Sequence, residues 1–289
     1  GNDTVTLATA LTTASDIDLG AGSDKLILAD TANEGSVANV ETIQGGTGVD
    51  NITLTSLISK GYIDLGGGSD TLTLGNFANV LSVANIESVL GGTGDDTVTA
   101  STGLSGATID LGNGNDKFTL GNFTNTATFS NVETIVGGST SDTITLATAL
   151  TTSDSINLGA GEVKLTLADV ANTGSVSNVE TLIGGSDADT ITFATAITGG
   201  LVDLGAGSNK LTLGNFTNSL TASNVGTLVG GSAADTVTLG TAMTGSVSVD
   251  LGSGSDTLIL ANAANSGSVS NVETLIGGSA ADTITFDTI

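Results

Sequence analysis

Short stretches in which apolar and polar residues alternate recur along the whole chain, as in residues 71–74 (TLTL) and 97–99 (TVT). Val, Ile, Leu and Phe point to one side, and Thr, Ser and Asp point to the other. This period of two predicts short strands with one buried face. Glycine-rich turns separate the stretches, and no helical periodicity is sustained. The pattern therefore predicts an all-β protein.

The pattern repeats at a nearly fixed interval. A Gly-Gly pair recurs every 46 or 47 residues, beginning at Gly45, Gly91, Gly137, Gly184, Gly230 and Gly277. We therefore expect a single repeat array over residues 1–289, with repeats at approximately 1–44, 45–90, 91–136, 137–183, 184–229 and 230–276 and a partial one at 277–289. Both ends fall in the middle of the pattern, so we expect the chain to be an excerpt of a longer polypeptide.

Strands this short cannot close a core singly, but stacked coils bury their apolar faces continuously. The repeat therefore predicts a parallel β-solenoid of the β-roll or β-helix type. A second turn, Leu-Gly-x-Gly, follows each Gly-Gly pair by about 20 residues and divides the repeat in two. We expect two coils of about 23 residues per repeat, and one 46-residue coil is the competing geometry.

Two turns, at residues 45–53 (GGTGVDNIT) and 91–99 (GGTGDDTVT), fit the nonapeptide G-G-x-G-x-D-x-U-x at every position. This motif resembles that of the RTX (repeats in toxin) family, secreted bacterial proteins with calcium-binding parallel β-rolls. Glycines let the turn point carbonyl oxygens inward, and the Asp adds a charged oxygen, which suits a cation with six to eight oxygen ligands. The resemblance implies Ca²⁺ as the cofactor.

The metal ligands that the resemblance implies are the Asp residues of these turns and of the Leu-Gly-x-Gly turns: Asp24, Asp50, Asp70, Asp96, Asp116 and Asp256. Turns that match the motif less completely add Asp3, Asp142, Asp189, Asp235 and Asp282. The resemblance also implies that Asp24, Asp50, Asp70, Asp96 and Asp116 form one column along a single edge. Val163 and Asn209 take the place of the acid in two turns.

The chain carries 30 acidic residues against 5 Lys or Arg, for a net charge of −25. Such a surface repels nucleic acids and anionic lipids, so we expect neither nucleic-acid binding nor direct membrane insertion. The chain lacks His and Cys, which excludes imidazole catalysis, thiol nucleophiles and Cys/His zinc sites. Stacked carboxylates repel unless they are neutralised, so the natural partners are cations.

Three further sets of residues recur with the repeat. The sequence predicts a solvated outer face for Asp18, Asp64, Asp110, Asp203 and Asp250, and a stacked amide ladder for Asn39, Asn85, Asn131, Asn178, Asn224 and Asn271. Lys25, Lys117, Lys164 and Lys210 follow the motif position. They are either internal counter-charges or exposed strand residues.

These features favour a non-catalytic structural repeat region of a secreted bacterial surface protein, in an S-layer, an adhesin stalk or an extracellular fibre. We expect calcium to fold and rigidify it outside the cell, after export by type I secretion, and its other partners to be neighbouring repeats or copies of itself. One alternative is ice binding by an outward Thr-x-Thr grid. Another is a polysaccharide-active β-helix enzyme, which the identical recurrence of the paired Asp residues disfavours.

Overall fold

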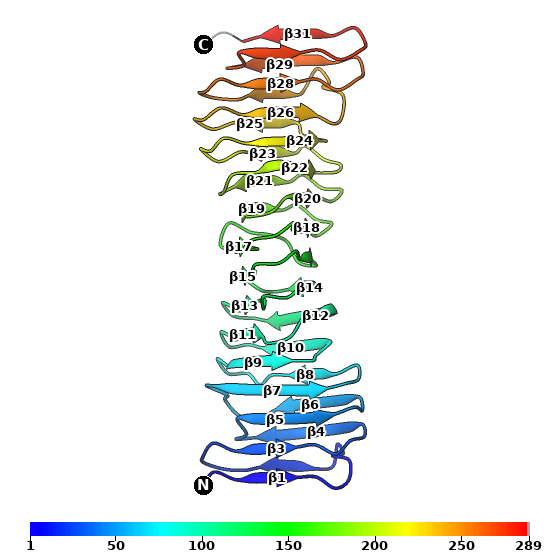
Figure 1. Cartoon of the computed structure of the whole chain (residues 1–289), viewed down its shortest axis with the longest axis vertical. Coiled ribbons are helices and arrows are strands. Elements are labelled where there is room, and N and C mark those ends of the chain that lie inside the picture. The colour runs from blue at the N-terminus through cyan, green and yellow to red at the C-terminus, as the bar shows by residue number, and fades with distance from the viewer. Residues whose placement is uncertain (288–289) are drawn as a thin grey trace. The chain divides into compact units, whose positions relative to one another are not determined.

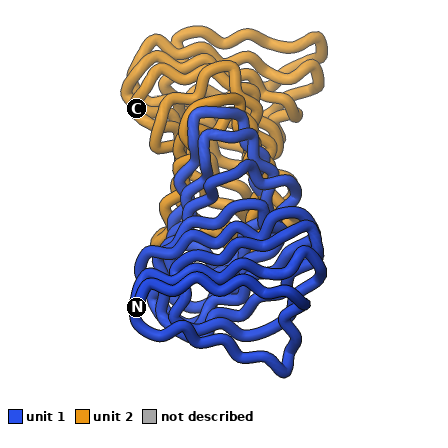
Figure 2. Tube along the Cα trace, turned by 60° about the horizontal axis from the view of Figure 1, so that its bottom comes forward, with its two compact units in different colours: residues 1–144 blue, residues 145–289 orange. Residues whose placement is uncertain are grey.

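The computed structural model describes residues 1–287, and every regular element within them is a β-strand. The strands stack in succession with parallel neighbours, which confirms the predicted parallel β-solenoid (Figure 1). The chain forms two compact units, residues 1–144 and 145–289 (Figure 2). Each unit contains two facing sheets, one of odd-numbered and one of even-numbered strands.

In the first unit, the odd sheet consists of β1 (Thr4–Thr6), β3 (Lys25–Ile27), β5 (Thr42–Gly46), β7 (Gly61–Gly66), β9 (Val80–Ala84), β11 (Thr97–Ala100), β13 (Lys117–Thr119) and β15 (Thr134–Val136). The even sheet consists of β2 (Asp16–Asp18), β4 (Asn33–Ala38), β6 (Asp50–Leu54), β8 (Thr71–Thr73), β10 (Ser88–Gly92), β12 (Ser105–Gly112) and β14 (Thr126–Ser130). Strand β16 (Thr143–Leu146) includes the last residues of this unit and the first of the next.

In the second unit, the odd sheet consists of β17 (Ser155–Asn157), β19 (Thr173–Ser177), β21 (Thr190–Phe193), β23 (Lys210–Thr212), β25 (Thr227–Val229), β27 (Ser248–Asp250), β29 (Ser266–Ser270) and β31 (Thr283–Phe286). The even sheet consists of β18 (Lys164–Thr166), β20 (Thr181–Ile183), β22 (Thr198–Asp203), β24 (Ser219–Ser223), β26 (Thr236–Leu239), β28 (Thr257–Ile259) and β30 (Thr274–Ile276).

The core lies between the two sheets and is built from the apolar residues of the alternating pattern. On β13, Phe118 is fully buried and lies in register with Val98 of β11 and Ile135 of β15. Its ring meets that of Phe129 on β14 edge to face, with centroids 5.1 Å apart. Stacking therefore joins the apolar faces of successive strands into one continuous core, as the period-two pattern predicts.

The prediction of two coils per repeat is wrong, and so is the competing prediction of one large coil. One coil contains two strands, and five strands, β6 to β10, begin within the repeat at 45–90. The repeat therefore makes two and a half coils. Neighbouring residues in a sheet lie 17 to 21 positions apart along the chain, as Lys25 pairs with Thr42 and Thr4 pairs with Lys25.

A third turn in each repeat explains the difference. The segment that joins the two strands of a half-repeat is a tight turn, which runs from a Leu to an Asn as in residues 28–33 and 74–79. Because five is an odd number, equivalent strands of consecutive repeats lie in opposite sheets: β5 belongs to the odd sheet and β10 to the even sheet. Equivalent turns consequently alternate between the two edges of each unit.

Candidate functional site: buried carboxylate ladders

Most of the turn Asp residues point into the protein. The side chains of Asp24, Asp50, Asp70, Asp96, Asp116, Asp142, Asp189, Asp235 and Asp256 are at most 1% exposed. The other two candidates differ, since Asp3 is exposed and Asp282 is partly exposed. A carboxylate that is taken out of water needs hydrogen bonds, a proton or a cation.

The expected single column of Asp residues is wrong. Asp50 and Asp70 lie at turns that lead from the odd to the even sheet, whereas Asp24, Asp96 and Asp116 lie at turns on the opposite edge. The half-coil left over in each repeat moves the next set of turns to the other edge. The structure therefore brings the Asp residues together in pairs, namely Asp3 with Asp24, Asp50 with Asp70, Asp96 with Asp116 and Asp235 with Asp256.

Three of these pairs belong to ladders that cross four consecutive coils, whereas the pair of Asp3 and Asp24 continues only to Glu41. Asn33 donates its backbone N–H and its side-chain amide to Asp50 Oδ1, at 3.0 and 2.7 Å. The Asp50 N–H donates to Asp70 Oδ1 at 2.8 Å, and the Asp70 N–H donates to Glu87 Oε2 at 2.8 Å. The same order recurs as Asn79–Asp96–Asp116–Glu133 in the first unit and as Asn218–Asp235–Asp256–Glu273 in the second.

Sequence reasoning missed the two ends of this ladder. The Asn residues at its start are at most 2% exposed and recur at 46- or 47-residue intervals: Asn33, Asn79, Asn125, Asn172, Asn218 and Asn265. The Glu residues at its end, such as Glu87, lie two positions after the recurring Asn residues, such as Asn85. The spacing of both was visible in the sequence, but only the stacking of coils places them in line with the Asp residues.

One carboxylate oxygen in most of these turns has no hydrogen-bond partner. The unpartnered and buried atom is Oδ2 of Asp24, Asp50, Asp70, Asp96, Asp116, Asp142, Asp189 and Asp256. In the equivalent turn at Asp235, the Gly231 N–H approaches Oδ2 at 3.3 Å. Burial raises the pKa of the Asp70 and Asp116 carboxyls to about 6, and it also raises the pKa of Asp50 and Asp96. The buried carboxylates are therefore only partly compensated by hydrogen bonds.

The turn at Asn209 indicates what this position requires. The Asn209 side-chain NH₂ lies 2.9–3.2 Å from four carbonyl oxygens, those of Leu204, Gly205, Ala206 and Asn224. The turn at residues 65–70 has the same Leu-Gly-x-Gly-Ser sequence, but there Asp70 presents a carboxylate oxygen where Asn209 presents NH₂. An oxygen that faces carbonyl oxygens is unfavourable unless a proton or a cation lies between them.

The donor chemistry of the Asp turns fits calcium, which binds carboxylate and carbonyl oxygens. Within the described residues, no group of three or more acidic side chains could hold a metal ion. Each ion would therefore be held by one Asp, or by a stacked pair such as Asp50 and Asp70, and otherwise by turn carbonyls. The turns at Val163 and Asn209 do not supply the carboxylate.

The outer Asp residues have a structural role in the turns. Asp64 Oδ1 accepts a hydrogen bond from the Gly66 N–H at 3.2 Å and from the Asn85 side chain at 2.7 Å. The stacked amide ladder that was expected for Asn39, Asn85, Asn131, Asn178, Asn224 and Asn271 is wrong. All six of these Asn residues have φ between 50° and 57°. Five of them donate a side-chain hydrogen bond to the outer Asp that lies 21 positions earlier, on the preceding coil: Asn39, Asn85, Asn131, Asn224 and Asn271.

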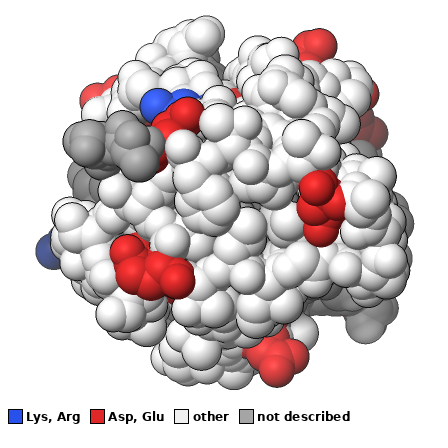
Figure 3. Space-filling model, turned by 90° about the horizontal axis from the view of Figure 1, so that it is seen from above, with Lys and Arg blue, Asp and Glu red and all other residues white. Residues whose placement is uncertain are grey.

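The outward faces of the sheets are mixed. The neighbours of Thr97 are Val80 on one side and Lys117 on the other, so Thr does not continue from strand to strand there. Lys117, Lys164 and Lys210 are exposed strand residues, and no Lys forms a salt bridge within residues 1–287. Viewed from the C-terminal end, the acidic side chains lie apart from one another on a mostly uncharged surface (Figure 3).

The described part of the chain contains no helix of the length and apolarity that a bilayer crossing requires. Comparison of the chain with models of protein families, with curated proteins and with solved structures gives no match.

Proposed function

We propose that this chain is a non-catalytic structural repeat region of a secreted bacterial surface protein, folded and rigidified by calcium at its Gly/Asp turns. The observation that carries this proposal is the set of buried Asp carboxylates with an unpartnered Oδ2. They occupy the turn position at which the Asn209 side chain meets four carbonyl oxygens. The resemblance of residues 45–53 and 91–99 to RTX repeats supports the choice of calcium and of an extracellular location.

Charge gives this proposal its mechanism. Without a cation, the stacked Asp residues place like charges on neighbouring coils and keep buried oxygens unpaired, and both effects oppose folding. A bound calcium ion would supply the positive charge that those oxygens lack. Because the turns exist only in the folded chain, calcium would stabilise the solenoid by binding the native state alone. A chain in a calcium-poor cytoplasm would then remain loose enough for export.

Circular dichroism with EGTA and with about 1 mM Ca²⁺ tests the mechanism, because strand content and melting temperature should both rise with calcium. The adjacent residues Asp95 and Asp96 provide a matched pair of variants. Asp96 is buried, with an unpartnered Oδ2, whereas Asp95 is exposed and accepts the Asn115 N–H at 2.9 Å. Both Asp→Asn changes remove one charge and keep Oδ1.

We expect Asp96→Asn to reduce the calcium-induced rise in melting temperature and the number of bound ions measured by isothermal titration calorimetry. Asp95→Asn should leave both unchanged. Equal effects of the two variants would show that calcium acts on the general acidity of the surface. Strand content and melting temperature that respond to neither calcium nor EGTA would rule out the calcium mechanism and leave the solenoid fold intact.

A further inference from the structure

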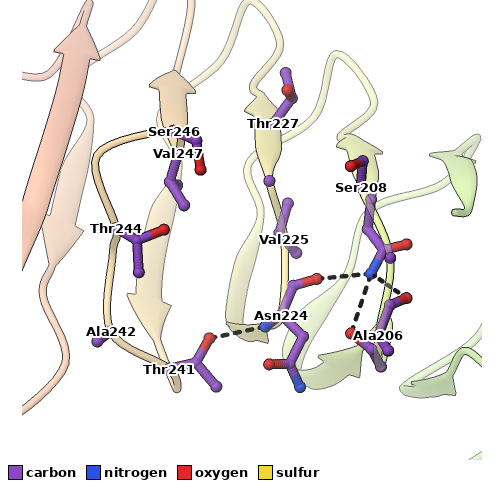
Figure 4. Close-up of a pocket in the computed structure, with 14 residues that line it drawn as sticks. Ala206, Ser208, Asn224, Val225, Thr227, Thr241, Ala242, Thr244, Ser246 and Val247 are labelled. Atoms are coloured by element: carbon purple, nitrogen blue, oxygen red, sulfur yellow. Dashed lines mark hydrogen bonds between the residues drawn. The ribbon is translucent and has the colours of Figure 1, made fainter. Parts of the chain in front are cut away.

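One position in the second unit departs from the repeat twice. At Asn209 an amide takes the place of the ladder Asp, and one coil later Gly226 takes the place of the ladder Glu. The two changes remove two negative charges from one site. At this site lies a hollow of about 470 Å³, between the turns at 205–209 and 224–227 and the connection at 241–247 (Figure 4).

The other copies define what normally fills this position. In five of them a Glu carboxylate accepts the backbone N–H of the residue at the Asp position, at 2.7–2.8 Å, and the acceptors are Glu41, Glu87, Glu133, Glu180 and Glu273. The same hydrogen bond forms at the turn that has Val163 in place of the Asp, where the Val163 N–H donates to Glu180. The position is therefore a built carboxylate site that does not depend on the Asp side chain.

At Gly226 this acceptor is missing while the donor remains. The Asn209 backbone N–H has no acceptor among the described residues, although the Asn209 residue is 99% buried. A Cβ on Gly226 would lie 3.7 Å from Asn209 N, which is ordinary contact, and 3.2 Å from Asn209 O, a tight contact that a small backbone shift must relieve. The copies with Glu carry a side chain at this position, so the space above the amide can take a carboxylate. A buried donor without a partner costs free energy, which a carboxylate from outside the chain would recover.

The lining of the hollow indicates which carboxylates suit it. It carries the hydroxyl groups of Ser208, Thr227, Thr241, Thr244 and Ser246, and no charged side chain lines it within the described residues. The nearby Asp203 carboxylate is occupied by the Gly205 N–H and the Asn224 side chain, at 3.0 and 2.6 Å. Hydroxyl groups around an anion site suit a ligand that carries hydroxyl groups beside its carboxylate.

We infer that this hollow binds a small hydroxylated carboxylate of the sugar-acid class, whose carboxylate takes the place of the missing Glu and accepts the Asn209 N–H. Neither Asn209 nor Gly226 supplies a carboxylate for calcium, although the Asn209 side chain accepts the N–H of Asp189 at 2.8 Å. The net charge of −25 opposes anion binding, so we expect a dissociation constant of about 1–10 mM.

The test follows the Asn209 amide by NMR in protein labelled with ¹⁵N-asparagine. Sodium glucuronate should shift this resonance in a saturable manner, whereas glucose, which lacks the carboxylate, and sodium chloride at equal ionic strength should not. Gly226→Glu supplies the carboxylate from within the chain. It should move the Asn209 resonance in the same direction without ligand and weaken glucuronate binding at least about tenfold.

Glu180→Gly is the converse variant, because it opens the same position above the Val163 amide, and it should create a second glucuronate site detected in ¹⁵N-valine-labelled protein. Circular dichroism checks that both variants fold. The inference is overturned by the absence of a saturable shift at about 100 mM glucuronate. It is also overturned if Gly226→Glu binds glucuronate as the unaltered protein does, or if inorganic phosphate binds as tightly as glucuronate.

Discussion

The Asp70 carboxyl gives the sharpest test of the buried ladder, because its environment fixes the sign of a pH effect. Asp70 is fully buried, and the largest cause of its raised pKa is burial, which outweighs the hydrogen bond from the Asp50 N–H. The folded pKa is about 6 against an ordinary value of 3.8. The folded protein therefore holds this proton more tightly than the unfolded chain does.

Calcium-free protein should consequently be more stable in acid. The contribution of Asp70 is fully present below about pH 4 and is lost as the pH rises through about 6. The difference in pKa corresponds to about 3 kcal/mol, and solvent screening at the edge of the solenoid reduces the expected change to about 1–2 kcal/mol. Urea unfolding in EGTA, followed by circular dichroism between about pH 4 and pH 7, measures it.

Asp70→Asn should remove this loss. The amide oxygen can still accept the Asp50 N–H, and the NH₂ can donate to turn carbonyls as Asn209 does. We expect the variant to be about 1–2 kcal/mol more stable than the unaltered protein at neutral pH in EGTA, and to respond less to calcium. Asp64→Asn, which makes the same change at a partly exposed carboxyl, is the control. The reasoning is refuted if calcium-free protein gains stability from pH 4 to pH 7, or if Asp70→Asn is destabilised at neutral pH.

Three further predictions concern the coil itself, and urea unfolding measures each of them. Gly68 has φ of +148°, and a Cβ there would lie 2.5 Å from Gly48 O on the neighbouring coil. Gly106 has φ of +72° and open space around its Cβ position, so Gly106→Ala should lower the free energy of unfolding by roughly 1 kcal/mol and Gly68→Ala by well over that. Equal losses would show that the close contact between Gly68 and Gly48 does not limit the side chain at residue 68. Asn85 has φ of 50°, a backbone conformation that Gly adopts freely and Ala does not. Asn85→Ala should therefore lower the free energy of unfolding by about 1–2 kcal/mol, and Asn85→Gly should lower it less. Phe118→Ala should cost about 3–5 kcal/mol because this side chain is fully buried, and a loss below 1 kcal/mol would contradict continuous packing.

Much of the candidate site could be predicted from the residues, because its parts are local. A Gly-rich turn with an Asp is a property of six or so consecutive residues, and nine of the eleven predicted Asp residues are indeed buried in such turns. The partners of those Asp residues were not predicted. Asn33 and Glu87 lie 17 positions before Asp50 and 17 positions after Asp70, and only the coil length puts them in contact.

The hollow at Gly226 shows the same limit. The replacement of Glu by Gly and of Asp by Asn was visible as two separate irregularities in the repeat. Their meaning depends on the contact between them, because the Glu of one coil accepts the N–H of the preceding coil. Seen in the sequence alone, Gly226 is only a position at which a Glu has been lost. In the folded chain, the loss of that Glu leaves the Asn209 N–H without an acceptor beside the hollow.

The sequence by itself determined the strands, the buried face of each strand, the 46-residue period and the parallel solenoid, because alternation and glycine turns act over a few residues. The tertiary structure alone decided how many coils the period spans. A third tight turn gives five strands per repeat, an odd number, so equivalent turns alternate between the two edges of each unit. The period in the sequence measures distance along the chain, whereas the ladders and the hollow depend on which turns stack on the same edge.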